Sequence, residues 1–549
     1  MIKNKVIFYT PCQYKLNDGL CLKYYYGEDY KMSLEIMKEA ININRFFEQQ
    51  SAQVIIQTDI IVPDVKPDIS KILVIDADDF ITSTETYPDR VLVEGSLKFK
   101  IIYTSENSDE RVKSIDYTYH FTQNVAIQGV RQGMKAKAKC IVEHVAYDIV
   151  NERKVNVKAI ANMLVKVFEE ERQQVAYSIE GSEDVQVLRK TLRADTLVQT
   201  FEDKYSVSED MDIPSGKPSI GEILRTDVAV AQKDVKIDEN KILIKADINV
   251  KNIYASDDPS RLIQAVEHEV PFTKLIEVEE VSENSKCICD INIADYVIEI
   301  AQDNDGESRI ISFKADVNVD LQVYETKFFD NIEDAYAPGK KLILNRTQVY
   351  IPSQTVYEKA QSLIKESIFV FDDKPRISEV LSIIAKPEVS QINVSDDRIE
   401  IEGVVDCKIL YASSEEDSPM HCAESQLPFT HVIDAKGIIA EQRCSFDTFL
   451  TNLSYSLISG NEIEVRCAVE SEIFYICGHE ARIINSVEET ALDESMRYRK
   501  ASFILYFAQE NDTLWDIAKM YSTTMEKIKK VNGISDDEII EPGRKILII

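Results

Sequence analysis

The stretch Lys100-Ile101-Ile102-Tyr103-Thr104-Ser105 decides the fold, because close versions of it occur three times in the 549 residues of the chain. It returns as KNIYAS at 251–256 and as KILYAS at 408–413. In each copy a Lys-Pro-x-Ile motif comes first, with its proline 33 positions before the lysine, and a Phe-Thr pair follows 18 positions after the tyrosine. The copies are offset by 151 and 157 positions. Three motifs at fixed spacing indicate a triplicated module of about 150 residues.

Apolar residues alternate with polar ones in the segment that leads into each of these tyrosines. In the first copy the alternating positions are Val91, Val93, Gly95, Leu97, Phe99, Ile101 and Tyr103. A period of two over this length predicts a half-buried β-strand. The small residue in its middle, which is Gly95, Ala246 or Gly403 in the three copies, suggests a bend or a close approach of another backbone.

Helical spacing follows each Lys-Pro-x-Ile motif. In the first copy Ile69, Ile72 and Leu73 are spaced i, i+3, i+4, and proline suits the first turn of a helix. Residues 31–50 also carry apolar positions at mixed helical spacing and predict a helix leading into the first copy. Charged stretches such as 169–174 are expected to be connectors or exposed helices. Each module is therefore expected to be mainly β, with a minor helix.

The expected fold class is mainly β, with sandwich-like packing of each repeat. Further strand-like segments lie at 140–150, 154–168, 310–324 and 462–475. The expected division is an N-terminal segment at 1–50, followed by three tandem β-rich repeat domains at 51–170, 195–325 and 346–488.

Residues 503–549 form a module of another kind, in which the pattern indicates the order strand, helix, helix, strand. Thr513 and Asp516 fit a capping box that starts the first helix, and a second box at Thr523–Glu526 starts the other. Asn532-Gly533 ends the second helix, because both residues tolerate the left-handed conformation. A small α/β unit is therefore expected at this end of the chain.

The chain is strongly acidic. Lys and Arg total 63 and Asp and Glu total 95, so the formal net charge is −32. A field of this sign repels phosphate backbones and anionic lipids, so no nucleic-acid partner and no direct membrane insertion are expected. The apolar stretch Val6–Tyr9 is too short for a secretory signal, and no apolar run approaches the length of a membrane span. The chain is therefore expected to stay in the cytoplasm of the cell that makes it.

The ten cysteines are expected to be reduced and mostly buried. Cys407, His421, Cys422 and His431 are metal-type ligands, but their spacing matches no zinc finger. The strand register makes Cys407 a core side chain instead, because its equivalents in the other two copies are apolar. No metal and no cofactor are expected. Spacing indicates no Ser-His-Asp or Cys-His arrangement, so no catalytic residues are expected and the chain is predicted not to be an enzyme.

The C-terminal module resembles the LysM domain. The resemblance rests on Tyr506, Asp512-Thr513-Leu514, Ile517-Ala518, Tyr521, Ile528, Asn532, Pro542-Gly543 and Ile546. Asn511 stands where the family usually has glycine, and asparagine can adopt the left-handed conformation that this turn requires. The resemblance implies a groove for N-acetylglucosamine glycans between two loops, here 509–514 and 533–541.

Three such repeats followed by a LysM domain resemble the clostridial SPOCS-domain family of spore coat morphogenesis proteins, of the SipL type. The second copy departs from the family motif, with Asn252 in place of isoleucine. The resemblance implies a scaffold in the mother-cell cytoplasm, recruited to the forespore surface. There its LysM domain is implied to bind a protein partner, the spore coat morphogenetic ATPase. The missing signal peptide favours this role over glycan binding, because peptidoglycan lies outside the cytoplasmic membrane.

The candidate partner-binding residues are Asp512, Thr513, Leu514, Trp515 and Ile534. Trp515, the single tryptophan, either caps the edge of a small core or presents an exposed face as a binding hot spot. Asp512 and Thr513 are first a turn and a helix cap, and Leu514 favours the core. Ile534 is either a loop contact or a plug. Two other functions stay open: binding of peptidoglycan that contains N-acetylglucosamine, in the cortex or cell wall, and an enzyme hidden in one repeat.

Overall fold

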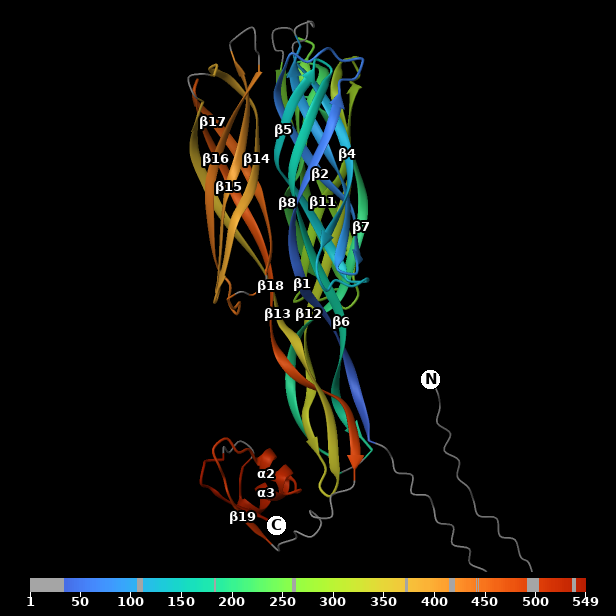
Figure 1. The fold of residues 1–549 in the computed structure, drawn as a ribbon, viewed down its shortest axis with the longest axis vertical. Helices are drawn as coiled ribbons and strands as arrows, with labels where there is room; N and C mark the ends of the chain where they lie inside the picture. Colours follow the sequence, from blue (N-terminus) through green and yellow to red (C-terminus); the bar gives the residue numbers. More distant parts are fainter. Residues whose placement is uncertain are drawn as a thin grey trace, which may run out of the picture.

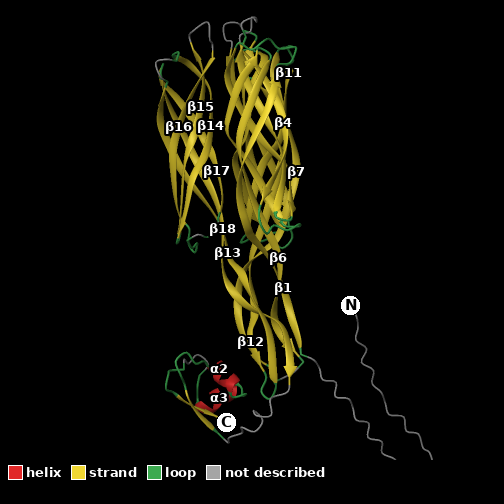
Figure 2. Cartoon of the chain, viewed as in Figure 1, coloured by secondary structure: helices red, strands yellow, loops and turns green. Residues whose placement is uncertain are grey.

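The computed structural model of the chain consists almost entirely of long β-strands (Figure 1, Figure 2). It describes residues 34–105, 112–181, 184–258, 263–370, 374–413, 420–440, 442, 444–490, 503–535 and 540–549. Within these ranges the α-helices are α2 (Leu514–Met520) and α3 (Met525–Asn532), both in the C-terminal module. They are seven and eight residues long, and neither could span a membrane.

Each of the three repeats contributes six strands to the fold. In the first copy these are β1 (Glu35–Ile61), β2 (Lys71–Tyr87), β3 (Arg90–Thr104), β4 (Val112–Ala126), β5 (Lys135–Asn151) and β6 (Lys154–Glu180). They form two antiparallel three-stranded sheets, in the orders β1-β6-β5 and β2-β3-β4. The expected start and end of the first repeat, residues 51 and 170, therefore fall inside β1 and β6.

The second and third copies repeat this topology. The second copy consists of β7 (Gln186–Asp212), β8 (Ile220–Asp238), β9 (Lys241–Ser256), β10 (Ile263–Glu277), β11 (Lys286–Gln302) and β12 (Ser308–Tyr336). The third consists of β13 (Lys341–Phe369), β14 (Ile377–Ser395), β15 (Arg398–Ser413), β16 (Met420–Asp434), β17 (Ser445–Ser459) and β18 (Glu462–Thr490). In both, the first, last and fifth strands form one sheet and the second, third and fourth the other. The predicted class, mainly β with three repeated units, is confirmed.

The alternating segment forms a strand in every copy, as the pattern predicted, and this strand is the central one of its sheet. The alternate residues from Val91 to Tyr103 in β3 are buried. Cys407, at the equivalent of Phe99, is buried in the core of the third copy, which confirms its assignment to packing. The hairpin turns before these strands place Asp89, Asn240 and Asp397 at φ values of 58°, 57° and 58°, a left-handed conformation that these residue types tolerate.

The small residue in the middle of this strand allows a close backbone approach. A Cβ atom added at Gly95 would collide with the carbonyl oxygen of Phe80 and lie 2.8 Å from Cζ of Phe121. Phe121 belongs to the Phe-Thr motif and pairs directly with Gly95 across β3 and β4. The motif thus places an aromatic ring over a residue that has no side chain.

The helices predicted after each Lys-Pro-x-Ile motif are wrong, because these segments enter strands β2, β8 and β14. In the first copy a β-bulge between Ile72 and Val74 shifts the register of β2 against β3. The bulge places Ile72 and Ile75 in one core cluster, which Ile69 joins from the segment before the strand. A bulge after one residue turns a period of two into a local spacing of three, which imitates a helix.

The helices predicted further along the chain are also wrong. Residues 35–50 belong to β1, and residues 31–33 lie outside the described residues. The charged stretch 169–174 belongs to β6, where it pairs with β1. Glu169, for example, lies opposite Arg45 and accepts a hydrogen bond of 2.8 Å from it. Polar cross-strand pairs of this kind stabilise a strand that has no apolar alternation.

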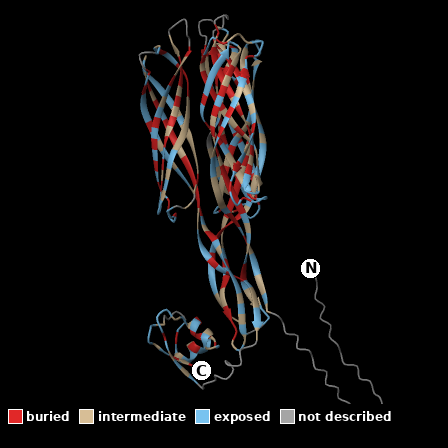
Figure 3. Cartoon of the chain, in the orientation of Figure 1, coloured by how far each residue is buried: buried red, intermediate tan, exposed pale blue. Residues whose placement is uncertain are grey.

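The three copies pack against one another through equivalent positions. Each copy has its own core between its two sheets, and Figure 3 colours the buried residues along the strands red. A further core cluster contains Ile102, Ile253 and Leu410 together with Val112, Ile263 and Met420. Within each set of three, the members are separated by the repeat offsets. The outer faces of the β3, β9 and β15 sheets therefore meet in an approximately threefold arrangement.

A buried ion network joins the first and second copies beside this cluster. The ammonium of Lys100 contacts Asp78 of its own copy and lies 3.1 Å from Asp227 of the second copy. The Arg225 guanidinium lies 2.8 Å from Asp227 and 3.0 Å from Asp76 of the first copy. Burial alone would lower the pKa of Lys100, but the carboxylates of Asp227 and Asp78 raise it well above its ordinary value. The network also reaches the third copy, because Lys386 of β14 lies 3.1 Å from the other oxygen of Asp76.

The first and last strands of each copy continue beyond the sandwiches into a shared stalk (Figure 1). Its core combines Ile41, Leu192, Phe329, Ile351 and Ile483, from all three copies. Asn44 of β1 donates a hydrogen bond of 2.8 Å to the Tyr324 hydroxyl of β12. Near the end of the stalk lies the C-terminal module, in which β19 (Ile504–Phe507) pairs with β20 (Lys545–Ile548) beside α2 and α3.

Candidate partner-binding site

The first loop of the C-terminal module is held by Asp512. Its Oδ2 accepts hydrogen bonds from the Tyr506 hydroxyl at 2.6 Å and from the Gln509 backbone N–H at 2.7 Å. These two bonds lower the pKa of Asp512, and the partnership raises the pKa of Tyr506 to about 12. Asn511 beside it has a φ of 68°, the left-handed conformation expected from the sequence. Asp512 is therefore a turn residue first, as expected.

The helix caps follow the predicted pattern with one shift. Thr513 is the N-cap of α2, and its Oγ1 accepts a hydrogen bond of 3.1 Å from the Asp516 N–H. The cap of α3 is Thr524, not Thr523, and it accepts from the Lys527 N–H at 3.3 Å. The second box was therefore placed one residue too early. Gly533, with a φ of 63°, ends α3 as predicted.

Asn532 joins α3 to β20 from the side. Its amide nitrogen donates to the Leu547 carbonyl at 2.7 Å, and its Oδ1 accepts from the Leu547 N–H at 2.7 Å. A side-chain amide can pair with a backbone amide in this way because it carries both a donor and an acceptor. The residue therefore covers one edge of the two-stranded sheet and fixes the helix against it.

Trp515 and Ile534 are buried, and Leu514 is half-buried, so none of these three candidate residues is fully exposed to a partner. Ile534 is buried, and its N–H donates to the Lys529 carbonyl at 3.1 Å, which fits a plug. Leu514 packs against the core of the module. Trp515 is 5% exposed, which fits the first of its two interpretations, a cap on the edge of a small core. Binding of a partner through these residues stays a prediction.

Trp515 is buried because the C-terminal module docks on the end of β12. The indole Nε1–H donates to Oδ2 of Asp334 at 2.8 Å. The indole ring meets the ring of Tyr336 edge-to-face, with centroids 4.8 Å apart. Lys519 of α2 donates to both oxygens of Asp334, at 2.8 and 2.6 Å, and the Tyr336 hydroxyl donates to the Thr523 carbonyl at 2.8 Å.

The electrostatics of this contact favour an ionised Asp334. Burial alone would raise its pKa, but hydrogen bonds from Lys519 and Trp515 and the charges of Lys519 and Arg346 lower it. Burial, together with the nearby Asp334 carboxylate, raises the pKa of Tyr336 to about 12. Both groups therefore keep at neutral pH the protonation states that the hydrogen bonds need. Sequence analysis missed Asp334 and Tyr336, because no local pattern distinguishes them from other residues of the β12–β13 hairpin.

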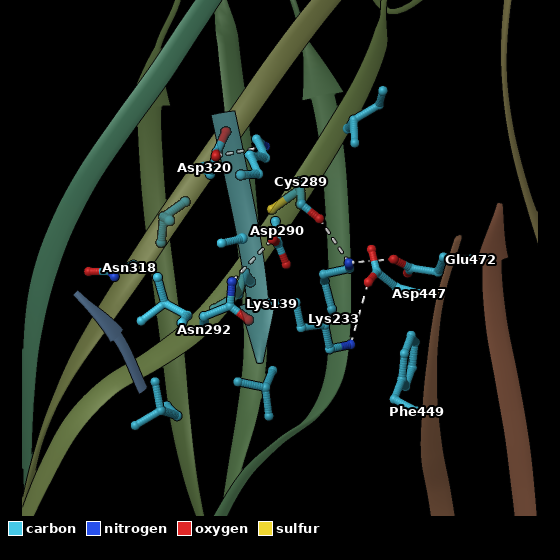
Figure 4. Close-up of a pocket in the computed structure, with 18 of the residues that line it drawn as sticks. Lys139, Lys233, Cys289, Asp290, Asn292, Asn318, Asp320, Asp447, Phe449 and Glu472 are labelled. Atoms are coloured by element: carbon cyan, nitrogen blue, oxygen red, sulfur yellow. Dashed lines mark hydrogen bonds and ion pairs between the residues drawn. The ribbon is translucent and has the colours of Figure 1, made fainter. Parts of the chain in front are cut away.

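A cavity of about 1220 Å³ lies between the three repeats and is lined by residues of all three copies. Figure 4 shows part of its wall, where Lys139 and Lys233 point toward Asp447 and Glu472. Lys139 and Lys166 of the first copy pair with Asp447 of the third, with Nζ–Oδ distances of 3.4 and 3.2 Å. Lys233 of the second copy lies 2.9 Å from Glu472 of the third. These five charged groups thus tie the first and second copies to the third.

The described ranges contain no group of three His, Cys, Asp or Glu residues that could hold a metal ion. In the cavity wall, burial raises the thiol pKa of both Cys140 and Cys289. A protonated thiol is a weak nucleophile and a poor metal ligand. These cysteines are therefore packing residues.

Two family models match the chain. The model of the SipL SPOCS domain matches residues 68–150, 219–301 and 376–458, and the LysM domain model matches residues 508–548. Each SPOCS match spans the second to fifth strands of a copy, whereas the first and last strands, which build the stalk, lie outside it. Neither domain family is catalytic. Comparisons with curated proteins and with solved structures give no match. The chain thus carries three SPOCS domains followed by one LysM domain, which is the SipL-type domain architecture.

Proposed function

We propose that the protein is a non-enzymatic adaptor in spore coat assembly. Its LysM domain binds the spore coat morphogenetic ATPase at the forespore surface, and the protein works in the mother-cell cytoplasm. The observation that carries this proposal is the domain combination: three SPOCS repeats share one β framework, and a single LysM domain lies near the end of its stalk. A long framework with a terminal binding module suits a protein that connects two structures.

The contacts between repeats support a scaffold role. Several charged residues that line the shared cavity pair across copies, as Lys137 does with Asp320 at 2.6 Å. Groups engaged in such pairs are not free to act as general acids or bases. An enzymatic site would instead need titratable groups directed at a substrate.

The test is binding of the purified ATPase to the full-length chain. Leu514→Glu and Trp515→Glu place a charge at two candidate residues that pack in the core cluster of the LysM domain, and folded variants should bind about tenfold more weakly or worse, as expected for hot-spot residues. Val297→Glu is the matched control, because Val297 is 51% exposed on β11 of the second repeat. Thermal unfolding of each variant checks that the LysM domain still folds. Wild-type affinity in folded LysM variants would contradict the proposal.

Glycan binding is the alternative function, and the LysM match itself favours it. Its groove would lie between loops 509–514 and 533–541, of which residues 536–539 lie outside the described residues. Because Trp515 is the single tryptophan of the chain, its fluorescence can follow a titration of the full-length protein with chitin oligomers. A saturable change with oligomers, together with no binding of the ATPase, would favour the glycan over the protein partner.

A further inference from the structure

The surface that Asp334 and Tyr336 cover on the LysM domain has a definite chemistry. It offers one N–H donor from Trp515, one ammonium from Lys519, an aromatic ring and the backbone carbonyl of Thr523. We call these three residues, Trp515, Lys519 and Thr523, the LysM pocket. A ligand that satisfies all four features needs a carboxylate and a phenol.

The spacing of the two covering residues adds a geometric requirement. Asp334 and Tyr336 are two positions apart at the end of β12, which continues through Ala337 into the hairpin with β13. In an extended strand, side chains two residues apart lie on the same face, about 6–7 Å apart. The segment Asp334-Ala335-Tyr336 is therefore an acidic–aromatic pair on one face of a strand, seated on its complement.

We propose that the LysM pocket is a receptor for extended segments that carry a carboxylate two residues before a tyrosine. Asp334-Ala335-Tyr336 occupies the pocket in cis, and a protein partner with the same chemistry replaces it. The inference rests on the proposed function, because it specifies what the LysM domain recognises in a protein partner. The docked arrangement is then a closed state, in which Asp334 and Tyr336 cover the binding residues of the LysM pocket.

Exchange of the two segments follows from simple competition. A tethered segment has a high effective concentration for its pocket, so it holds the closed state although the contact is small. The apparent affinity for a partner is then the intrinsic affinity reduced by the fraction of open molecules. Removing the side chains of the internal segment should therefore strengthen the binding of a separate peptide that carries the same carboxylate and tyrosine.

The experiment uses the full-length chain and the fluorescence of Trp515. The open variant is Asp334→Asn with Tyr336→Ala, which removes the carboxylate and the phenol but leaves the pocket intact. The matched control is Asp330→Asn with Phe328→Ala, an acid and an aromatic residue with the same spacing on the same strand. Phe328 is 70% exposed, and Asp330 accepts a hydrogen bond from Thr191 of β7. Asp334→Asn alone, which keeps the ring contact, is included in case the double change unfolds the LysM domain.

Two readouts follow. Quenching of Trp515 by acrylamide should increase about threefold in the open variant and stay at the wild-type value in the control, because only the open variant exposes the indole. A synthetic peptide with the sequence of residues 331–340 should bind the open variant about tenfold more tightly than it binds wild type. The same peptide with its Asp and Tyr replaced by Asn and Ala should not bind.

Two results would overturn the inference. The first is acrylamide quenching of Trp515 that is equal in the open variant and in wild type. The second is an equal affinity of the two proteins for the 331–340 peptide. If the double variant is unfolded, the same comparisons are made with Asp334→Asn, which should show smaller shifts in the same direction. The peptide assay contains no ATPase, so its failure is distinct from a failure of the proposed function.

Discussion

The hydroxyl of Tyr103 donates a hydrogen bond of 2.8 Å to the carbonyl oxygen of Pro67. The equivalent bonds in the second and third repeats, from Tyr254 and Tyr411 to the prolines of their own motifs, measure 2.9 and 3.2 Å. In every repeat, the tyrosine of one motif thus hydrogen-bonds to the proline of the Lys-Pro-x-Ile motif. In the first repeat this bond ties the segment before β2 to the end of β3, and its counterparts do the same in the other copies.

Replacing Tyr103 with phenylalanine should lower the free energy of unfolding by about 1 kcal/mol, the net value of a typical hydrogen bond in a folded protein. Urea denaturation measures the change. Tyr147→Phe is the matched control, because Tyr147 is exposed on β5 of the same repeat. If the two variants had the same urea midpoint, the Tyr103–Pro67 bond would contribute nothing measurable.

Gly403→Ala should destabilise the third repeat by about 1–3 kcal/mol, the usual cost of overpacking a core. The added Cβ would collide with the Glu388 carbonyl and lie 2.6 Å from Cζ of Phe429. The second repeat carries Ala246 at the equivalent position, so Ala246→Gly is the matched control and should cost under about 1 kcal/mol. Thermal unfolding compares the two variants. An unchanged melting temperature for Gly403→Ala would contradict the inference that the close backbone approach requires glycine.

Lys100→Met should cost about 2 kcal/mol, because it removes a buried ammonium from the partly exposed Asp78 and Asp227, while Arg225 still pairs with Asp227. Lys251 is its equivalent in the second repeat, but it is 22% exposed and lies 3.9 Å from Glu267. Lys251→Met should therefore cost under about 0.5 kcal/mol. Chemical denaturation of both variants measures the difference. Equal effects would contradict a role for Lys100 in joining the first two copies.

Asp79→Asn should stabilise the protein at neutral pH. Burial in the cavity wall, opposed by Lys386 and reinforced by Asp78, raises the pKa of Asp79 from 3.8 to about 6. Since the folded-state pKa lies above the unfolded one, wild type loses stability as the pH rises through this window. The variant should gain up to about 3 kcal/mol at pH 7 and about 1 kcal/mol at pH 4.5. Denaturant titrations at the two pH values measure the free energy of unfolding of both proteins. If the gain of the variant were the same at both pH values, its cause would be packing and not the ionisation of Asp79.

The sequence predicted those parts of the fold whose side chains face one core. The alternation that ends at Tyr103, and its equivalents, marked a strand because one face of that strand packs inside its own sandwich. The LysM elements were predicted because their caps, Thr513 and Gly533, act within a few residues of chain. Local rules suffice for both.

The stalk and the docked LysM contact could not be predicted in this way. Ile41 of β1 packs against residues of the other two copies, and the polar stretch 169–174 is held by pairs with β1. Neither leaves an alternation that a local pattern can detect. Asp334 lies 181 positions from Trp515, and nothing near it in the sequence marks it as a partner of the LysM domain. Contacts of this range depend on how the repeats assemble.

The most direct test of the central claim is isolation of the tagged full-length chain from sporulating cells, with quantitative mass spectrometry of what accompanies it. Wild-type protein should bring down the spore coat morphogenetic ATPase, and Leu514→Glu should lose it while Val297→Glu retains it. Equal recovery of the ATPase with all three proteins, or recovery of cortex muropeptides in its place, would contradict the view that the LysM domain serves a protein partner.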